Sequence, residues 1–373
     1  MSLSIGIVGL PNVGKSTLFN ALTLKSVPAE NYPFCTIDPS VGVVAVPDDR
    51  LWKLSEFSKT QKTVPAIVEF VDIAGLVKGA SEGEGLGNKF LTNIRETDAI
   101  LEVVRIFEDD KIIHVHGKVD PKGDIETINL ELIMSDLETV KKRLVNLVRD
   151  VKRGDKAAVA EHAVLERVLA ALQQSKLAHS LGYKDEELPF VKGMHLLTMK
   201  PILYCLNKKA GGKNLDELAG SDGKPGTEAR FSALLTYLAE QKAKYVVVDA
   251  GVEHELKDLK GDEKELFRKE LGGKDDGIDN LIRSSYDLLG LMTYFTTGEK
   301  ETRAWTIRKG STAPIAGTAI HNDFKDRFVK AEAIAWNVLL EAGSFGVARE
   351  KGLLRTEGKE YIVQDGDVLE FKI

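Results

Sequence analysis

Gly9-Leu-Pro-Asn-Val-Gly-Lys-Ser-Thr17 decides the fold of this chain, because it joins an apolar run, Ile5–Val8, to the helical pattern of residues 17–22. A loop of the form G-x-x-x-x-G-K-[ST] between a strand and a helix wraps its backbone N–H groups around phosphate oxygens. The lysine then brings a positive charge to the outer phosphates, and the serine hydroxyl can ligate magnesium. We therefore expect a nucleoside triphosphate and Mg²⁺ to bind here. The expected contacts come from Asn12, Val13, Gly14, Lys15, Ser16 and Thr17.

Further short apolar runs predict the strands of a sheet around this loop. They are Ala66–Val71, Ala99–Val104, Pro201–Leu206 and Tyr245–Val248. Several are too continuously apolar to have one face in water, which is typical of parallel strands covered by helices on both sides. The fold class that follows is α/β, with a doubly wound sheet.

Two motifs after the loop predict how the site senses the third phosphate. Asp72-Ile-Ala-Gly75 ends a predicted strand, where the aspartate can face magnesium and the Gly75 N–H can face the γ-phosphate. Thr36 lies between the two motifs, where a hydroxyl can complete the magnesium shell. A proline-rich surface loop is the alternative interpretation of residues 32–39. The predicted metal ligands are thus Ser16, Thr36 and Asp72.

Composition limits the classes of protein that remain. The 373 residues are 43% hydrophobic and 29% charged, with a net charge of -6. No apolar run approaches the roughly 20 residues that cross a bilayer, so no membrane role is expected. The first residues lack the basic segment of a signal peptide, and the two cysteines, Cys35 and Cys205, have no metal-ligand spacing. We expect a cytoplasmic protein with free thiols.

A heptad pattern begins after residue 124 and predicts an inserted helical arm at 125–199. Its apolar positions are Ile133, Leu137, Val140, Leu144, Leu147 and Val151. The pattern breaks at Arg153-Gly-Asp155 and resumes at Leu165, which indicates two antiparallel helices. Residues 141–156 hold seven basic and two acidic side chains. Such a run is a solvated helix face or an RNA contact, and both interpretations stay open.

The last 80 or so residues predict a small α+β unit at 291–373. It contains an apolar run at Ala304–Arg308, a helical stretch at Val329–Ala342, and two strands, Glu360–Val363 and Val368–Ile373, joined by a turn at 365–366. The remaining segments, 1–124 and 200–290, then form the nucleotide-binding domain.

These motifs together resemble one protein family. The loop at 9–17, the stretch 72–87 and the heptad arm resemble the YchF/Obg-like ATPase branch of the Obg-related translation-factor GTPases. Residues 304–310, 317–324 and 331–333 resemble the TGS domain of that family, a β-grasp module. The resemblance implies a Mg²⁺-dependent nucleotide site and association with the ribosome, in particular its large subunit. The basic arm and the TGS-like domain are the candidate contacts, to RNA among others.

The segment Asn207-Lys-Lys-Ala210 departs from the patterns of related proteins. GTPases carry Asn-Lys-x-Asp here, and the aspartate accepts hydrogen bonds from guanine; the YchF-like family has Asn-x-x-Glu and is associated with ATP. Ala210 offers no carboxylate, so the preference between ATP and GTP stays open. Asn207 and Lys208 are expected to line the purine pocket, with a plain strand end as the alternative.

Leu76 is the second departure, since Ras-like switches carry a glutamine there to orient the attacking water. A leucine cannot orient water, and the family tends to carry a histidine in the region that includes His114. A neutral imidazole can orient or accept from water. Lys15 and His114 are therefore the predicted catalytic residues, although His114 can equally be an ordinary strand or loop residue.

The predicted function is that of a ribosome-associated triphosphatase that hydrolyses ATP or GTP and switches conformation with it. A nucleotide-gated RNA-binding or ribosome-binding module, with slow and incidental hydrolysis, is the alternative. A metabolic kinase fits less well, because the chain shows no evident motif for an acceptor substrate.

Overall fold

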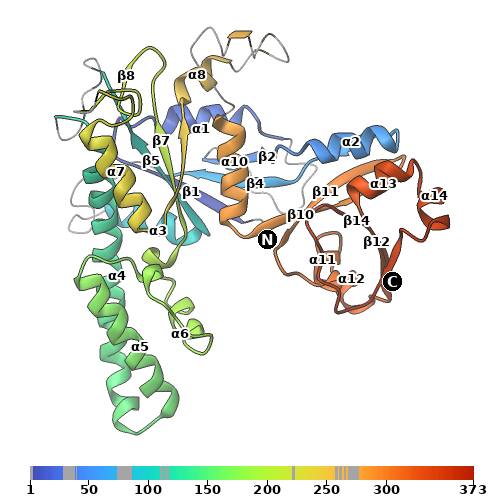
Figure 1. Cartoon of the computed structure of the whole chain (residues 1–373). Coiled ribbons are helices and arrows are strands. Elements are labelled where there is room, and N and C mark those ends of the chain that lie inside the picture. The colour runs from blue at the N-terminus through green and yellow to red at the C-terminus, as the bar shows by residue number, and fades with distance from the viewer. Residues whose placement is uncertain are drawn as a thin grey trace.

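The computed structural model describes residues 3–27, 38, 40–73, 86–109, 112, 114, 117–220, 223–256, 259, 263, 266–267 and 277–373. Figure 1 shows three parts: a central sheet with helices around it, a long helical pair that projects from it, and a second sheet near the C-terminus. The helical pair consists of α4 (Pro121–Lys152) and α5 (Lys156–Gln173).

The central sheet has the strand order β2-β4-β1-β5-β7-β9. The strands are β1 (Ser4–Val8), β2 (Val41–Ala45), β4 (Ile67–Asp72), β5 (Ala99–Arg105), β7 (Ile202–Asn207) and β9 (Lys244–Val248). The five predicted runs all form strands, and those five strands are parallel. Only β2, which the sequence did not predict, runs antiparallel beside β4. The carboxyl ends of the parallel strands meet at one edge, where ligands of such sheets bind.

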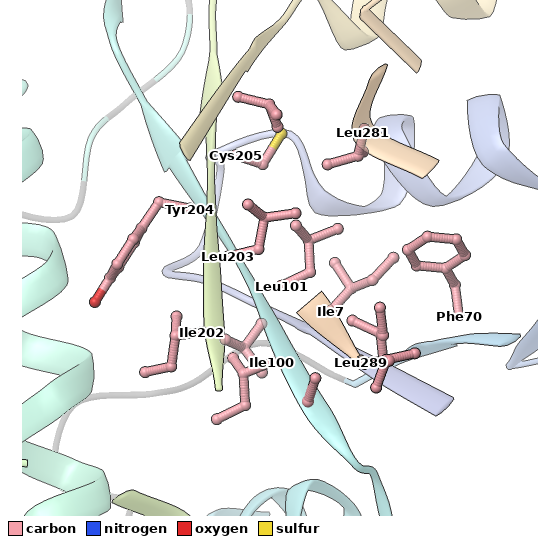
Figure 2. Packing of buried hydrophobic residues seen from close by; sticks show 14 of the residues in the cluster. Ile7, Phe70, Ile100, Leu101, Ile202, Leu203, Tyr204, Cys205, Leu281 and Leu289 are labelled. Atoms are coloured by element: carbon pink, nitrogen blue, oxygen red, sulfur yellow. The ribbon is translucent and has the colours of Figure 1, made fainter. Parts of the chain in front are cut away.

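Helices cover both faces of the central sheet. They include α1 (Lys15–Thr23), α3 (Leu86–Glu96), α7 (Ala229–Glu240), α8 (Ala250–Glu255) and α10 (Gly277–Leu288). Figure 2 shows Leu281 of α10 on the same side of the sheet as Leu101 and Leu203, whereas Tyr204 points to the opposite side. This alternation of neighbours on β7 is the period of two that buries both faces of a strand.

The helical pair has the seam that the heptad pattern predicts. Ile133, Val140 and Leu147 are buried, and the intervening Leu137, Leu144 and Val151 pack against the same core. Arg153 ends α4, Gly154 takes a φ of 77°, and Asp155 begins α5 by accepting a hydrogen bond from the Ala158 N–H. After α5 the chain returns to the sheet through short helices at Ala178–Ser180, Leu188–Lys192 (α6) and Leu197–Met199.

The second sheet has the order β13-β12-β14-β10-β11-β3. Its C-terminal strands are β10 (Leu291–Thr296), β11 (Glu301–Arg308), β12 (Lys330–Ala335), β13 (Arg355–Glu357) and β14 (Asp367–Lys372). Four short helices accompany them: α11 (Ala313–Gly317), α12 (Asp323–Asp326), α13 (Trp336–Ala342) and α14 (Phe345–Glu350). The remaining strand, β3 (Lys62–Val64), comes from the N-terminal half and follows α2 (Asp49–Phe57), so the segment predicted as 1–124 contributes to both sheets.

The helix predicted at Val329–Ala342 is wrong in its first half. Residues 330–335 form β12, which pairs with both β13 and β14. Alanine and glutamate favour helices, but Ala331 and Ala333 are fully buried at a spacing of two. Pairing on both edges therefore overrides local propensity, and the helix begins only at Trp336.

The strand predicted at Glu360–Val363 is also wrong. This segment bonds the loop before α11 instead: Ala313 N–H donates to Tyr361 O at 2.8 Å, and Val363 N–H donates to Ser311 O at 3.0 Å. The turn at 365–366 leads into β14, whose partners are β12 and β10. The last two apolar segments thus do not form a hairpin.

Two further expectations concern membranes and thiols. Within the described ranges, no helix combines the length and the apolar character that crossing a membrane requires. Cys205 is a free thiol inside β7, and burial raises its pKa to about 12. Cys35 lies outside the described residues.

Candidate functional site

The loop at 9–17 takes a conformation that depends on its glycines. Gly9 and Gly14 have φ values of 155° and 99°, and Asn12 has a φ of 63°. A Cβ on Gly14 would lie 2.2 Å from Nδ2 of Asn207, and one on Gly9 would lie 2.6 Å from the carbonyl oxygen of Val103. Both glycines are therefore required by close approach as well as by φ.

Asn207 braces this loop from the end of β7. Its Nδ2 donates to Val13 O at 2.8 Å, and its Oδ1 accepts from Ala250 N–H at 3.1 Å. The side chain thus ties the phosphate loop to the start of α8. Asn207 was predicted to line the purine pocket, and its contacts in this structure give it a bracing role.

Lys15 lies inside the loop that it serves. Its Nζ donates to the carbonyl oxygens of Gly9 and Leu10 at 2.9 and 2.8 Å, and the residue is only 9% exposed. Burial lowers the pKa of Lys15 to about 8, although the nearby Asp72 carboxylate opposes that shift. Phosphate oxygens that replace the two carbonyl acceptors would bind an ammonium group that is already in position.

Two of the predicted metal ligands are described. Ser16 is exposed in the first turn of α1, and Asp72 is half-buried at the end of β4, beside Ile7 of β1. Burial raises the pKa of Asp72, and the charge of Lys15 opposes the shift. Mg²⁺ prefers one or two carboxylates together with hydroxyl, water and phosphate oxygens, which suits this pair. Thr36 and Gly75 lie outside the described residues, as does Leu76.

The structure places a carboxylate, that of Asp249, beside the backbone of Ala210. Asp249 accepts hydrogen bonds from the backbone N–H of Val252, at 3.0 Å, and from the backbone of Ala210 and Gly251. Burial raises the pKa of Asp249, and Lys208 opposes that shift. The signal in the sequence was an aspartate between an apolar strand and the start of a helix, the N-cap position. Lys208 itself forms an ion pair with Glu217 at 3.2 Å.

His114 is held by a partner that the sequence did not predict. The residue is 6% exposed, and its Nε2 lies 2.9 Å from Oδ2 of Asp124 in the first turn of α4. Between β5 and His114, the guanidinium of Arg105 donates to the carbonyl oxygens of Phe107 and Ile112 at 2.9 and 3.1 Å. The structure therefore brings Lys15, Ser16, Asp72 and Asn207 to one edge of the sheet, and it places His114 in a buried hydrogen bond with the first turn of α4.

Known proteins match the chain along its whole length. A family profile described as "50S ribosome-binding GTPase" matches residues 4–148, and a YchF C-terminal profile described as "Protein of unknown function" matches residues 291–373. The Ribosome-binding ATPase YchF of Bacillus subtilis is 52% identical over 372 residues, and the protein of that name from Haemophilus influenzae is 47% identical; each match covers 100% of this chain and 99% of the relative.

A solved structure agrees with these matches. The YchF GTPase of Schizosaccharomyces pombe superposes with a TM-score of 0.85 at 38% identity, covering 100% of this chain and 98% of that one. It shares the P-loop sheet, the helical pair and the C-terminal β-rich domain. On the strength of full-length similarity to these relatives, the chain belongs to the YchF family of P-loop triphosphatases.

Proposed function

We propose that this protein is a ribosome-binding ATPase that binds ATP at the loop of residues 9–17. The observation that carries the proposal is the preformed phosphate cradle. In it, the buried ammonium of Lys15 donates hydrogen bonds to two backbone carbonyls of its own loop. The names of the relatives support the activity and the partner. The names of the relatives differ in the nucleotide that they imply, since one is called an ATPase and another a GTPase. The choice of ATP is therefore part of the proposal.

The residues of the site divide the work of phosphoryl transfer to water. Backbone N–H groups of residues 12–17 bind the phosphates, and Lys15 stabilises the charge that develops on the outer ones. Ser16, Asp72 and Thr36 would hold Mg²⁺, which neutralises phosphate charge when it is bound. Asn207 keeps the loop in shape through Val13 O. His114 is the group that orients water, once it is exposed.

One observation favours the alternative of a nucleotide-gated binding module with slow hydrolysis. The His114 imidazole is buried against Asp124 rather than exposed to water. A protein in this state holds the triphosphate and hydrolyses it slowly. The two functions are then two states of one molecule, distinguished by the position of His114.

The ribosome contact is assigned to the arm and to the C-terminal sheet. Lys152, Arg153 and Lys156 are exposed at the turn between α4 and α5. Basic side chains at an exposed tip suit the phosphates of RNA. The "50S ribosome-binding" description supports the large subunit, and binding to ribosomes implies the cytoplasm.

We divide the chain into a nucleotide-binding domain (1–124 and 200–290), the arm (125–199) and a TGS-like domain (291–373). The helical pair and the profile that begins at 291 support this division. The segment α2–β3 is the exception, because β3 pairs with β11 of the C-terminal sheet.

Phosphate release from ATP and from GTP, with and without ribosomes, tests the proposal. We expect Lys15→Ala to weaken ATP binding by about 10- to 100-fold, because a hydrogen bond to a charged group contributes about 1.5 to 3 kcal/mol. Circular dichroism should stay unchanged, since the side chain serves the ligand rather than the core. Wild-type affinity in this variant, or failure of the wild type to sediment with ribosomal large subunits, would contradict the proposed function.

A further inference from the structure

The hydrogen bond between His114 and Asp124 lies in the interior, where α4 begins. Each side chain is only 3% exposed, and the bond joins Nε2 to Oδ2 at 2.9 Å. A hydrogen bond to a charged partner is stronger in a buried site than in water, because the surrounding dielectric is low. As long as this bond holds, Nε2 is occupied by Asp124 and shielded from solvent.

Asp124 belongs to the same helix that forms the arm. It lies in the first turn of α4, whose 32 residues run without a break to Lys152 beside the basic tip. At 1.5 Å per residue the helix is about 48 Å long. The N-terminal end is fixed by the cap of Asp120 on Gly123 N–H, and the exposed end carries the basic side chains assigned to the ribosome. One continuous helix therefore connects the basic tip of the arm to Asp124.

We propose that Asp124 is a positioning residue that holds His114 away from water in the resting protein, and that a partner bound to the arm releases His114 by moving α4. This inference rests on the proposed function, in which His114 orients the attacking water. It adds the regulation of that site: the arm is the sensor, and the contact between Asp124 and His114 is the restraint.

The surroundings of the pair make the restraint specific. Glu102 of β5 is fully buried on the sheet below α4, and it lies beside Tyr204 of β7. Burial and the nearby Asp124 carboxylate raise the pKa of Glu102 well above its usual value. Asp124 is the carboxyl group that lies within hydrogen-bond distance of His114. Arg105 also contacts residues that precede His114, through Phe107 O and Ile112 O.

The test compares kcat for ATP in the absence of ribosomes. Asp124→Asn keeps the size of the side chain and removes its charge, and we expect kcat to rise by about tenfold with KM unchanged. In a His114→Ala background the same substitution should give no rise, because the gain acts through the imidazole. Ribosomes should accelerate the wild type by a larger factor than they accelerate Asp124→Asn.

Glu102→Gln is the matched control. It alters a buried carboxyl next to Asp124, and it preserves the shape of the protonated acid. We expect it to leave kcat within about twofold of wild type, because it does not touch the charge that holds His114.

A kcat in Asp124→Asn at or below the wild-type value, with unchanged melting temperature and ATP affinity, overturns the inference. If that variant melts early, Asp124→Ser replaces it in the same comparison. Failure of the proposed function has a different signature: hydrolysis that does not depend on Lys15, or a His114→Ala variant that hydrolyses ATP at the wild-type rate.

Discussion

The ammonium of Lys15 gains two carbonyl partners from its own loop and loses most of its water. The loss of water dominates, because the pKa falls to about 8 even though Asp72 lies nearby. A group poised in this way binds a triphosphate only in its charged form. The pKa of Lys15 therefore sets the upper end of the pH range in which the site binds a triphosphate.

We predict that ATP affinity is constant at neutral pH and falls above pH 8, by up to about tenfold per pH unit. Affinity falls rather than rises because the pKa of Lys15 is lowered. Above that pKa, Lys15 is neutral in the empty site and must take up a proton when ATP binds. Calorimetry from pH 7 to 9.5 measures the decline, and buffers of different ionisation enthalpy reveal the proton. Lys15→Arg is the control, since arginine stays charged and should remove the pH dependence of whatever affinity remains.

The preference for an adenine or a guanine nucleotide also depends on single residues. Ala210 has no acceptor for the N1–H and N2 amino donors of guanine, and unpaired buried donors cost about 1 to 3 kcal/mol each. The carboxylate of Asp249 is close to Ala210 but is already bonded to backbone N–H groups. We predict that ATP binds at least as tightly as GTP, and that Ala210→Asp shifts the preference toward GTP by about tenfold. Titrations with both nucleotides check this. Hundredfold tighter binding of GTP by the wild type would show that Asp249 or another acceptor reads guanine.

Sequence reasoning found the residues that belong to contiguous motifs and missed those that act through tertiary contact. Lys15, Ser16 and Asp72 follow apolar strands with a fixed spacing, so their meeting at one edge was predictable. Asp124 was one acidic residue in a polar segment before a heptad pattern, and Arg105 was a lone arginine after a strand. Only the packing of α4 beside β5 brings them to His114 and its loop.

At the scale of elements, the parallel strands of the central sheet were predictable because each contains an apolar run, and β1, β5 and β7 are buried on both faces. The C-terminal strands were harder. In β12 the residues Lys-Ala-Glu-Ala-Ile-Ala favour a helix locally, and their strand conformation comes from β13 and β14 on either side. The helical pair of the arm was predictable from its apolar seam. The partner of its exposed side was not predictable.

The arm offers a prediction of its own. Changing Lys152, Arg153 and Lys156 to glutamate should weaken co-sedimentation with ribosomes and leave ATP affinity unchanged, because these exposed residues lie far along the arm from the phosphate loop. Neutralised phosphates also imply that wild-type binding weakens as salt is raised. The control changes three exposed lysines away from the turn, Lys176, Lys184 and Lys192, to glutamate. If the tip variant sediments like the wild type at several salt concentrations, the basic residues form a solvated helix face and not an RNA contact.

The whole molecule is linked through one segment that the sequence did not single out. Between β2 and β4 the chain leaves the central sheet, forms α2, and adds β3 to the C-terminal sheet beside β11. Gln61 N–H donates to Glu299 O at 2.9 Å, and Thr60 Oγ1 donates to Gly298 O at 2.7 Å. Three residues of mixed character carried no strand signal, because β3 exists only by pairing with a distant partner. The strand that carries Asp72 therefore follows directly from a strand of the other sheet.

We predict that a nucleotide at the loop protects the backbone of β11 from hydrogen exchange, since β4 begins three residues after β3 and ends at Asp72. Arg50 of α2 holds this junction: its Nη1 lies 2.6 Å from Oδ2 of Asp365, and its guanidinium lies 5.3 Å from the ring centre of Phe295. Arg50→Ala should reduce the protection in β11 on addition of a non-hydrolysable ATP analogue. It should cost about 1 kcal/mol of stability, because the ion pair is partly exposed.

Arg355→Ala is the control for that experiment. Arg355 lies in the same sheet and contacts Asp367 and Tyr361, all within the C-terminal segment. Its loss should loosen the sheet without altering the response of β11 to nucleotide. If the analogue leaves exchange in β11 unchanged in the wild type, the C-terminal sheet does not sense the nucleotide through β3. In that case the arm helix, through Asp124, is the remaining route by which hydrolysis and partner binding communicate.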